Sequence, residues 1–301
     1  MARRRSNRKG GAGSPLKKLI LLIVVAVAAM FSYQPLTNAL QRGDWRGALT
    51  QVKEQLDAAN RQPDSHTDLS ATGGLELPAP LKGVPEKILK RTAYTVSYNS
   101  ERKVPNWVAW ELNRDRLVER ESRTDKFLPD PDLPESETVT TDDYKRTGWD
   151  RGHMCPAADC RWHWRAMQES FYMTNICPQH HNLNSGDWKE LEEACRRWAE
   201  QEGRIYIVCG PIFYKGKPRT IGREHRVAVP DAFFKVVLCA DSKQPRAIGF
   251  IYKNTAGNRK LDSYVNTVDQ VERITGIDFF PALPDDVERH VEAKADLGEW
   301  Q

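Results

Sequence analysis

Asp150, Arg151, Gly152 and His153 place three kinds of reactive side chain on four consecutive residues. The carboxylate and the imidazole can exchange a proton near neutral pH, and the guanidinium can bind an anion. A site that cleaves a phosphate ester needs this set: a proton acceptor, a group that orients it, and positive charge beside the phosphate. The same residues would also suit a turn that exposes a histidine, so alone they leave both interpretations open.

Asn184 and Glu192 form the second candidate group. The amide oxygen of Asn184 is a hard, neutral ligand suited to Mg²⁺, which keeps most of its waters and needs only one or two protein oxygens. Asn184 or Ser185 could instead cap the helix that follows. Glu192 lies about 12 Å further along a helix, so it would reach the same ion only through water unless the chain bends. It could equally be an exposed helix carboxylate, like Glu190 and Glu193.

The elements that must position these residues are a mixture of strands and helices. Trp188, Leu191, Cys195 and Trp198 recur at helical spacing, and Gly203 can end that helix. The pattern predicts further helices at 161–171, 265–275 and 285–299, strands at 92–98, 107–112, 205–209, 233–239 and 247–252, and loops at 128–141 and 176–186. Because strands and helices do not alternate regularly, we expect an α+β fold and not a doubly wound sheet.

The adjacent histidines His180 and His181 fall in the second of these loops. Neighbouring side chains rarely face one ion, so we expect solvent exposure there and not a metal pair.

The first 41 residues indicate export. Seven Lys and Arg residues and no acidic residue precede the apolar run Leu19–Phe31, and no further charge occurs before Arg42. A basic segment followed by an apolar core is typical of a signal peptide or an uncleaved anchor. We favour the anchor, and either version places the body outside the cytoplasm. The localisation expected is therefore extracytoplasmic: membrane-anchored, or periplasmic or secreted after cleavage.

Composition divides the remaining chain into a linker and a folded domain. We assign residues 1–41 to the basic tail and signal segment, 42–86 to a polar stalk or linker, and 87–301 to the domain. The whole chain carries a formal charge of +4, but without the seven basic residues of the tail it carries 38 basic and 41 acidic residues. Net charge therefore gives no indication of a nucleic-acid partner. A mean hydropathy of −0.64 excludes a polytopic membrane protein.

All six cysteines lie in the second half of the chain: Cys155, Cys160, Cys177, Cys195, Cys209 and Cys239. An even number suits an oxidising compartment, and six allow fifteen full pairings, so the sequence leaves the disulfide pattern open. A zinc site is disfavoured because the sequence contains no CxxC pair.

Three motifs in order resemble the DNA/RNA non-specific endonucleases of the ββα-metal class. They are DRGHMCPAAD from Asp150, TNICPQ from Thr174 and LNSGDWKELEE from Leu183. Four further segments also resemble that family: WVAWEL from Trp107, CGPIF from Cys209, VPDAFFKV from Val229 and ITGIDFFP from Ile274. Together the similarity covers about residues 88–290. The resemblance implies a ββα-metal (His-Me finger) fold with a central antiparallel sheet flanked by helices.

The resemblance also implies a role for each matching residue. His153 would be the general base that deprotonates the attacking water, with Asp150 supporting it. Asn184 would be the single direct protein ligand of a hydrated Mg²⁺, with Mn²⁺ or another divalent cation left open, and Glu192 would hold the water shell. Arg123 is the best match to the arginine that stabilises charge on phosphorus. Arg120 and Arg146 compete for that role, and Asn175 matches a structural asparagine.

The function implied is an exported, Mg²⁺-dependent, sugar-non-specific endonuclease. It would hydrolyse phosphodiester bonds of DNA and RNA to 5′-phosphorylated products. Two alternatives remain open at this point: a non-catalytic binding module with the nuclease fold, and a phosphodiesterase acting on small nucleotides. A homodimer is likewise left open.

Overall fold

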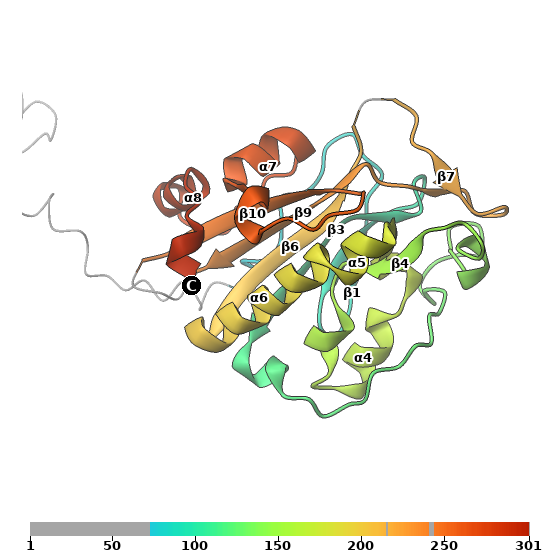
Figure 1. Ribbon diagram of the computed structural model, residues 1–301, viewed down its shortest axis with the longest axis horizontal. Coiled ribbons are helices and arrows are strands. Elements are labelled where there is room, and N and C mark those ends of the chain that lie inside the picture. Colours follow the sequence, from blue (N-terminus) through green and yellow to red (C-terminus); the bar gives the residue numbers. More distant parts are fainter. Residues whose placement is uncertain (1–72, 215, 241–243, 301) are drawn as a thin grey trace, which may run out of the picture. The chain divides into compact units, whose positions relative to one another are not determined.

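A seven-stranded antiparallel sheet forms the centre of the protein (Figure 1). The computed structural model describes residues 73–214, 216–240 and 244–300. The strands lie in the order β1-β2-β3-β6-β9-β10-β11. Their bounds are β1 Lys87–Lys90, β2 Thr95–Asn99, β3 Val104–Asn113, β6 Arg204–Ile212, β9 Ala232–Cys239, β10 Arg246–Lys253 and β11 Val265–Asn266.

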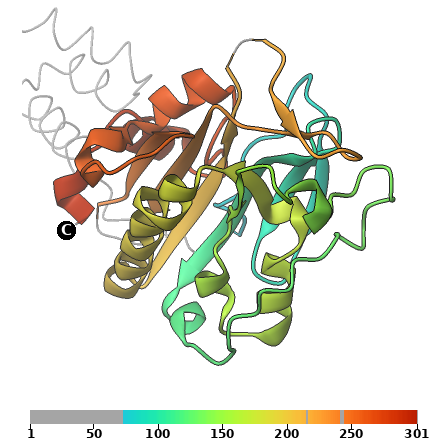
Figure 2. The ribbon, with the colours of Figure 1, turned by 45° about the vertical axis from the view of Figure 1, so that its right-hand side comes forward.

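Helices cover both faces of this sheet, which alternating side chains make apolar on each side. In β9, Phe233 and Val237 join the core beneath helix α6 (Asp187–Glu202), whereas Phe234 and Leu238 join the core on the opposite face. Helices α7 (Val268–Thr275) and α8 (Asp285–Glu292) contribute to that second core. Figures 1 and 2 show α6 on one side of the sheet and α7 with α8 on the other. The protein therefore has two apolar cores separated by one sheet.

A two-stranded antiparallel sheet, formed by β4 (Asp150–His153) and β5 (Ile176–Gln179), and a pair of short helices lie beside the α6 face. In this sheet, Gly152 lies opposite Cys177. Helix α4 (Trp164–Ser170) lies between these strands in the chain, and α5 (His181–Ser185) follows β5 and leads into α6. A second short ladder joins β7 (Thr220–Ile221) to β8 (Val227–Ala228). The order strand, strand, helix thus brings both candidate motifs to one place.

The α+β class expected from the sequence is confirmed, and most of the predicted elements are found. The segment 176–186, predicted as a loop, instead holds β5 and α5. The last helix, predicted over 285–299, ends at Glu292. Strand β5 has only four residues and includes Pro178, so its sequence does not resemble a strand. It forms because it pairs with β4, which is distant in the chain and which local patterns do not report.

Residues 73–86, the described end of the predicted linker, pack onto the domain. Leu75 is fully buried in the same core as Trp107 and Val291. The amide of Ala79 donates to the carbonyl of Asp278 at 2.9 Å. The predicted signal segment, residues 1–41, lies outside the described residues. Within the part that the structure describes, no helix is both long and apolar enough to cross a membrane.

The cysteines are all buried, and no disulfide joins any two of the six. The shortest contact given between two of them joins the Sγ atoms of Cys155 and Cys160, at 3.7 Å. The even count of cysteines therefore reflects buried thiols in the cores and not a disulfide framework.

Candidate active site

His153 ends strand β4 and is enclosed by aromatic rings. Its ring centroid lies 4.8 Å from that of Phe171 and 5.4 Å from that of Phe127. Gly152 allows β4 and β5 to lie close together next to His153, because a Cβ at this position would overlap the side chain of Gln179 on β5. Any larger residue would force the Gln179 side chain to shift.

This enclosure controls the protonation of His153. Burial, together with the positive charges of Arg123 and Arg151, lowers the pKa of His153 to about 3. The imidazole is therefore neutral at pH 7, the form that can accept a proton. Its Nε2 atom is buried and has no hydrogen-bond partner among the described residues, an exception that is informative because buried polar groups are normally paired.

Two side chains hold the backbone around His153. The Asn175 side chain accepts from the amide of Cys155 at 2.9 Å and donates to the carbonyls of Cys155 and Ser170, each at 2.8 Å. The indole of Trp188, on α6, donates to the His153 carbonyl at 3.3 Å. Asn175 is fully buried, so this is the structural role expected for it.

A sharp break at Gly186 separates α5, which carries Asn184, from α6, which carries Glu192. Gly186 has φ −112° and ψ −112°, and a Cβ there would lie 2.5 Å from the carbonyl oxygen of Asn182. The chain therefore bends between the two residues, and they do not stand 12 Å apart along one helix. Asn184 and Glu192 line the same pocket.

Asp150 interacts with the Asn184 side of the site. Its Oδ2 accepts from Asn184 Nδ2 at 3.0 Å and lies 2.8 Å from His181 Nδ1. The sequence suggested that Asp150 supports His153, but the hydrogen bonds found for its carboxylate go to Asn184 and His181. Asp150 therefore positions the asparagine, and the bond fixes the amide so that its oxygen remains available.

Arg123 shares with His153 a pocket of about 240 Å³ that Asn184 and Glu192 also line. Its guanidinium carbon lies 5.4 Å from the centroid of Phe171, the ring that also packs on His153. The two competing arginines, Arg120 and Arg146, do not line this pocket. Among the three arginines considered, the geometry favours Arg123.

Glu192 lies near buried charged residues that pack between α6 and the sheet, chiefly Lys235 and Asp159. Burial raises the pKa of Glu192 to about 7, against the opposing positive charge of Lys235. Lys235 on β9 is fully buried, with its Nζ 4.4 Å from the centroid of Trp188. Arg196, one turn beyond Glu192, lines the pocket and pairs with buried Asp159 at 3.1 Å.

The donor set suits a hard divalent cation. Asn184 offers an amide oxygen and Glu192 a carboxylate, the oxygen ligands that Mg²⁺ prefers. Arg123, Arg151 and Arg196 line the same pocket and supply positive charge for an anion. A neutral base, oxygen atoms suited to a hydrated metal ion and several guanidinium groups together can activate water against a phosphate ester.

Sequence reasoning missed three members of this site. His181 is exposed, as expected, but it lies on α5 and not in a loop, and its contact with Asp150 was not predicted. Arg196 stands four residues after Glu192, a spacing that places both on one helix face and could have identified it. Lys235 lies in an apolar strand and gave no such indication, because only the folded sheet places it beneath α6.

Comparisons with known proteins show which proteins the chain resembles. The profile of the family described as DNA/RNA non-specific endonuclease matches residues 78–286, more than two thirds of the chain. The mitochondrial nuclease EXOG of Danio rerio is 36% identical over 219 residues, covering 67% of this chain and 64% of that protein. A nuclease of Nostoc is 34% identical, covering 72% and 82%. Human mitochondrial endonuclease G is 31% identical, covering 65% and 70%.

A solved structure shares the fold. EndoG, in a structure of the EndoG/EndoGI complex, superposes with a TM-score of 0.62 at 26% identity, covering 67% of this chain and 89% of that one. The match spans only 64% and 58% of the EXOG proteins of Danio rerio and Xenopus laevis, respectively.

Proposed function

The chain belongs to the DNA/RNA non-specific endonuclease family, and from this membership we propose that it is a metal-dependent endonuclease. It hydrolyses phosphodiester bonds in both DNA and RNA and leaves 5′-phosphorylated products. The proposed metal is Mg²⁺, with Mn²⁺ or another divalent cation as the alternative.

The observation that carries the proposal is one pocket lined by His153, Arg123, Asn184 and Glu192. These residues come from a strand, a loop and two helices that the chain brings together only on folding. A binding module with this fold would have no need to keep a buried neutral imidazole beside an amide oxygen that can bind a metal ion and a carboxylate that can hold the ion's waters. The complete set therefore favours an enzyme over the non-catalytic alternative.

His153 takes the proton from the attacking water. Its neutral form is available because burial and two nearby arginines disfavour the imidazolium. Arg123 binds the phosphate and stabilises the charge that develops on its oxygens in the transition state. Arg151 lines the same pocket, and its guanidinium carbon lies 4.4 Å from the centroid of Phe127. That contact positions a second positive charge near the base.

Asn184 would hold the metal ion directly and Glu192 would accept hydrogen bonds from its waters. When bound, the ion supplies positive charge to the scissile phosphate and to the leaving oxygen. Asp150 keeps the Asn184 amide in one orientation. All of these groups act on phosphate, so the site need not recognise a base or a 2′-hydroxyl, which accounts for activity on both polymers.

The test is digestion of plasmid DNA and of RNA by the full chain, with Mg²⁺ or with EDTA. We expect Mg²⁺-dependent cleavage of both polymers. His153→Ala should reduce the cleavage rate by about 10²–10⁴-fold, the range for lost acid–base catalysis. The variant His290→Ala, which changes an exposed histidine on α8, should cleave normally. A folded, Mg²⁺-supplied protein that cuts neither polymer would contradict the proposal. Faster cleavage of a small chromogenic diester than of duplex DNA would favour the small-nucleotide alternative.

Export is a separate proposal that rests on residues 1–41. Their basic lead and apolar run support an extracytoplasmic body, either anchored or released after cleavage. Protease added to intact cells should degrade the anchored form, or the protein should be recovered outside the cytoplasm. Exclusive recovery from the cytosolic fraction would refute this proposal without affecting the proposed chemistry.

A further inference from the structure

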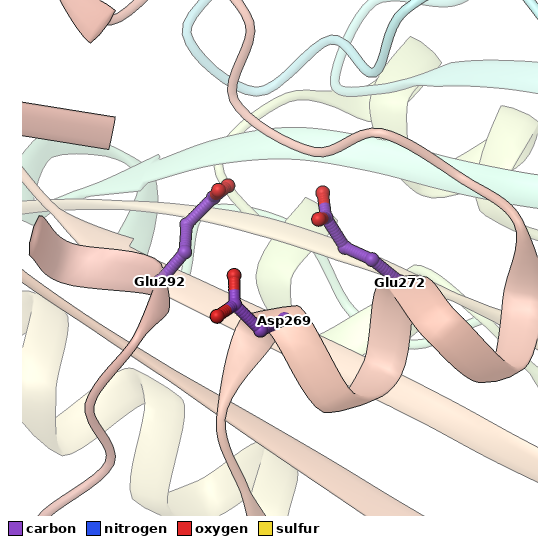
Figure 3. Close-up of side chains that lie close together, drawn as sticks. All are labelled: Asp269, Glu272 and Glu292. Carbon is purple, nitrogen blue, oxygen red and sulfur yellow. The ribbon is translucent and has the colours of Figure 1, made fainter. Parts of the chain in front are cut away.

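Three carboxylates converge between α7 and α8, on the face of the sheet opposite α6. Asp269 and Glu272 lie on α7, and Glu292 lies at the end of α8 (Figure 3). One oxygen from each lies within 4.8 Å of the others. His153, Asn184 and Glu192 belong to the other side of the sheet, so this acidic cluster is separate from the candidate active site.

Glu292 is the unusual member because its carboxylate is buried without a partner. The residue is only 6% exposed, and its Oε1 atom has no hydrogen-bond partner within residues 73–214, 216–240 and 244–300. Figure 3 shows its side chain directed toward Glu272 and Asp269. A buried, unpaired carboxylate oxygen is strongly unfavourable, which implies that some group satisfies it.

The charged groups that act most strongly on the Glu292 carboxylate are negative. Burial, together with the negative charges of nearby carboxylates, raises the pKa of Glu292 to about 9; these carboxylates are Glu272, Glu288, Asp269 and Asp278. Glu272 is partly satisfied, because its Oε1 accepts from the amide of Phe279 at 2.8 Å. Its second oxygen and the partly exposed Asp269 remain open to a ligand arriving from solvent.

Separations of at most 4.8 Å between these oxygens allow one hard divalent cation to contact all three. Oxygens on opposite sides of a Ca²⁺ lie about 4.6–5.2 Å apart, since each bond measures about 2.3–2.6 Å. We propose that Asp269, Glu272 and Glu292 bind one calcium-sized divalent cation that links α7 to α8. The ion would satisfy the buried Glu292 oxygen, balance most of the negative charge, and stabilise the helical layer against the sheet.

The experiment measures Ca²⁺ binding by the full chain carrying Asn184→Ala, which removes the candidate catalytic ligand. Equilibrium dialysis with Ca²⁺ should give one ion per chain, and Ca²⁺ should raise the thermal midpoint of this protein relative to EDTA. Adding Glu292→Gln, which keeps the shape and removes the charge, should abolish both effects. Asp286→Asn, an exposed acid on the same helix, is the matched control and should retain them.

Two outcomes would overturn the proposal. The first is Ca²⁺ binding that survives Glu292→Gln unchanged, which would place the ion elsewhere. The second is a folded Asn184→Ala protein that binds no Ca²⁺. If adding Glu292→Gln then makes that protein more stable in EDTA, a proton neutralises the cluster in place of an ion. If Glu292→Gln does not fold, Asp269→Asn at the partly exposed edge gives the same comparison. None of these results depends on nuclease activity.

Discussion

His153 and Asn184 take their chemistry from the groups that surround them. His153 is kept neutral by burial against Phe127 and Phe171 and by nearby arginines. Asn184 is oriented by a hydrogen bond that its amide nitrogen donates to Asp150. The motifs identified both residues as candidates, but neither the burial of the imidazole nor the partner of Asp150 can be found from sequence order alone.

Replacement of Asp150 separates its two suggested roles. If Asp150 positions Asn184, Asp150→Ala should raise the Mg²⁺ concentration needed for half-maximal cleavage by about 10–100-fold, the usual effect of losing a group that orients a metal ligand. The rate at saturating Mg²⁺ should recover most of the wild-type value. Titration of plasmid cleavage with Mg²⁺ checks this, and a rate that stays low at every concentration would instead indicate support of His153.

Arg123 should matter more than either competing arginine. Because it shares the pocket with His153, we expect Arg123→Ala to lower kcat by about 10²-fold, in the range found for loss of one group that stabilises transition-state charge. Arg120→Ala and Arg146→Ala are exposed controls that should change kcat little. Steady-state cleavage of one oligonucleotide by the three variants provides the measurement. A larger loss in either control would reassign the phosphate contact.

At the scale of elements, the site depends on how short segments join. The sequence predicted the long apolar strands and the Trp188 helix, because their periodicity is local. It missed β5 and α5, and it treated Asn184 as a residue that precedes the helix. At the break, Gly186 lies so close to the Asn182 carbonyl that a Cβ would be 2.5 Å from its oxygen, a contact that sequence patterns do not report. Residues that act together across such a break cannot be spaced correctly by counting along one helix.

The pair Asp143–His225 joins the segment before β4 to the residues before β8. Asp143 is almost fully buried, and its Oδ2 lies 2.8 Å from His225 Nδ1. Burial works to raise the pKa of Asp143, but hydrogen bonds from the Thr140 amide and from His225 outweigh it, so the pKa is lowered overall. A carboxylate with a lowered pKa stabilises the fold above its unfolded value of about 4, and this contribution is lost as pH falls through the folded value.

Asp143→Asn should therefore destabilise the protein at pH 7 but much less in acid. We expect a loss of about 1–3 kcal/mol in the free energy of unfolding at pH 7, as for a hydrogen bond to a charged group. The difference should shrink below pH 4. Urea denaturation at both pH values measures it, with Asp142→Asn, an exposed neighbour, as the control. An equal difference at pH 7 and pH 3 would show that charge is not the cause.

At the scale of the whole molecule, the sheet separates the candidate active site from the acidic cluster. Glu192 lies on one face, and Asp269, Glu272 and Glu292 lie on the other. The family match, the two cores and every candidate site residue lie within residues 73–300. Composition suggested that the domain begins near residue 87, because the preceding stretch from residue 42 is polar and residues 61–74 are rich in Pro, Asp, Ser, Thr and Gly. The packing of residues 73–86 depends on single buried residues such as Leu75, which composition does not distinguish.

A chain of residues 73–301 should fold and cleave nucleic acid like the full protein. A chain of residues 87–301 should be less stable, because it lacks the fully buried Leu75. In the longer chain, Leu75→Ala alone should cost about 2–5 kcal/mol, the range for truncating a buried leucine. Thermal unfolding and plasmid cleavage provide the comparison. Equal stability of the two chains would mean that residues 73–86 add nothing to the core.

The burial of all six thiols allows the native protein to report its own opening. A thiol reagent reacts only when a cysteine becomes accessible, so the rate of labelling at each one measures how often its surroundings open. Cys177 reports on the β4–β5 strand pair, Cys195 on α6, and Cys209 and Cys239 on the central sheet. Mass spectrometry of partly labelled protein would therefore rank these elements by local stability without any engineered probe.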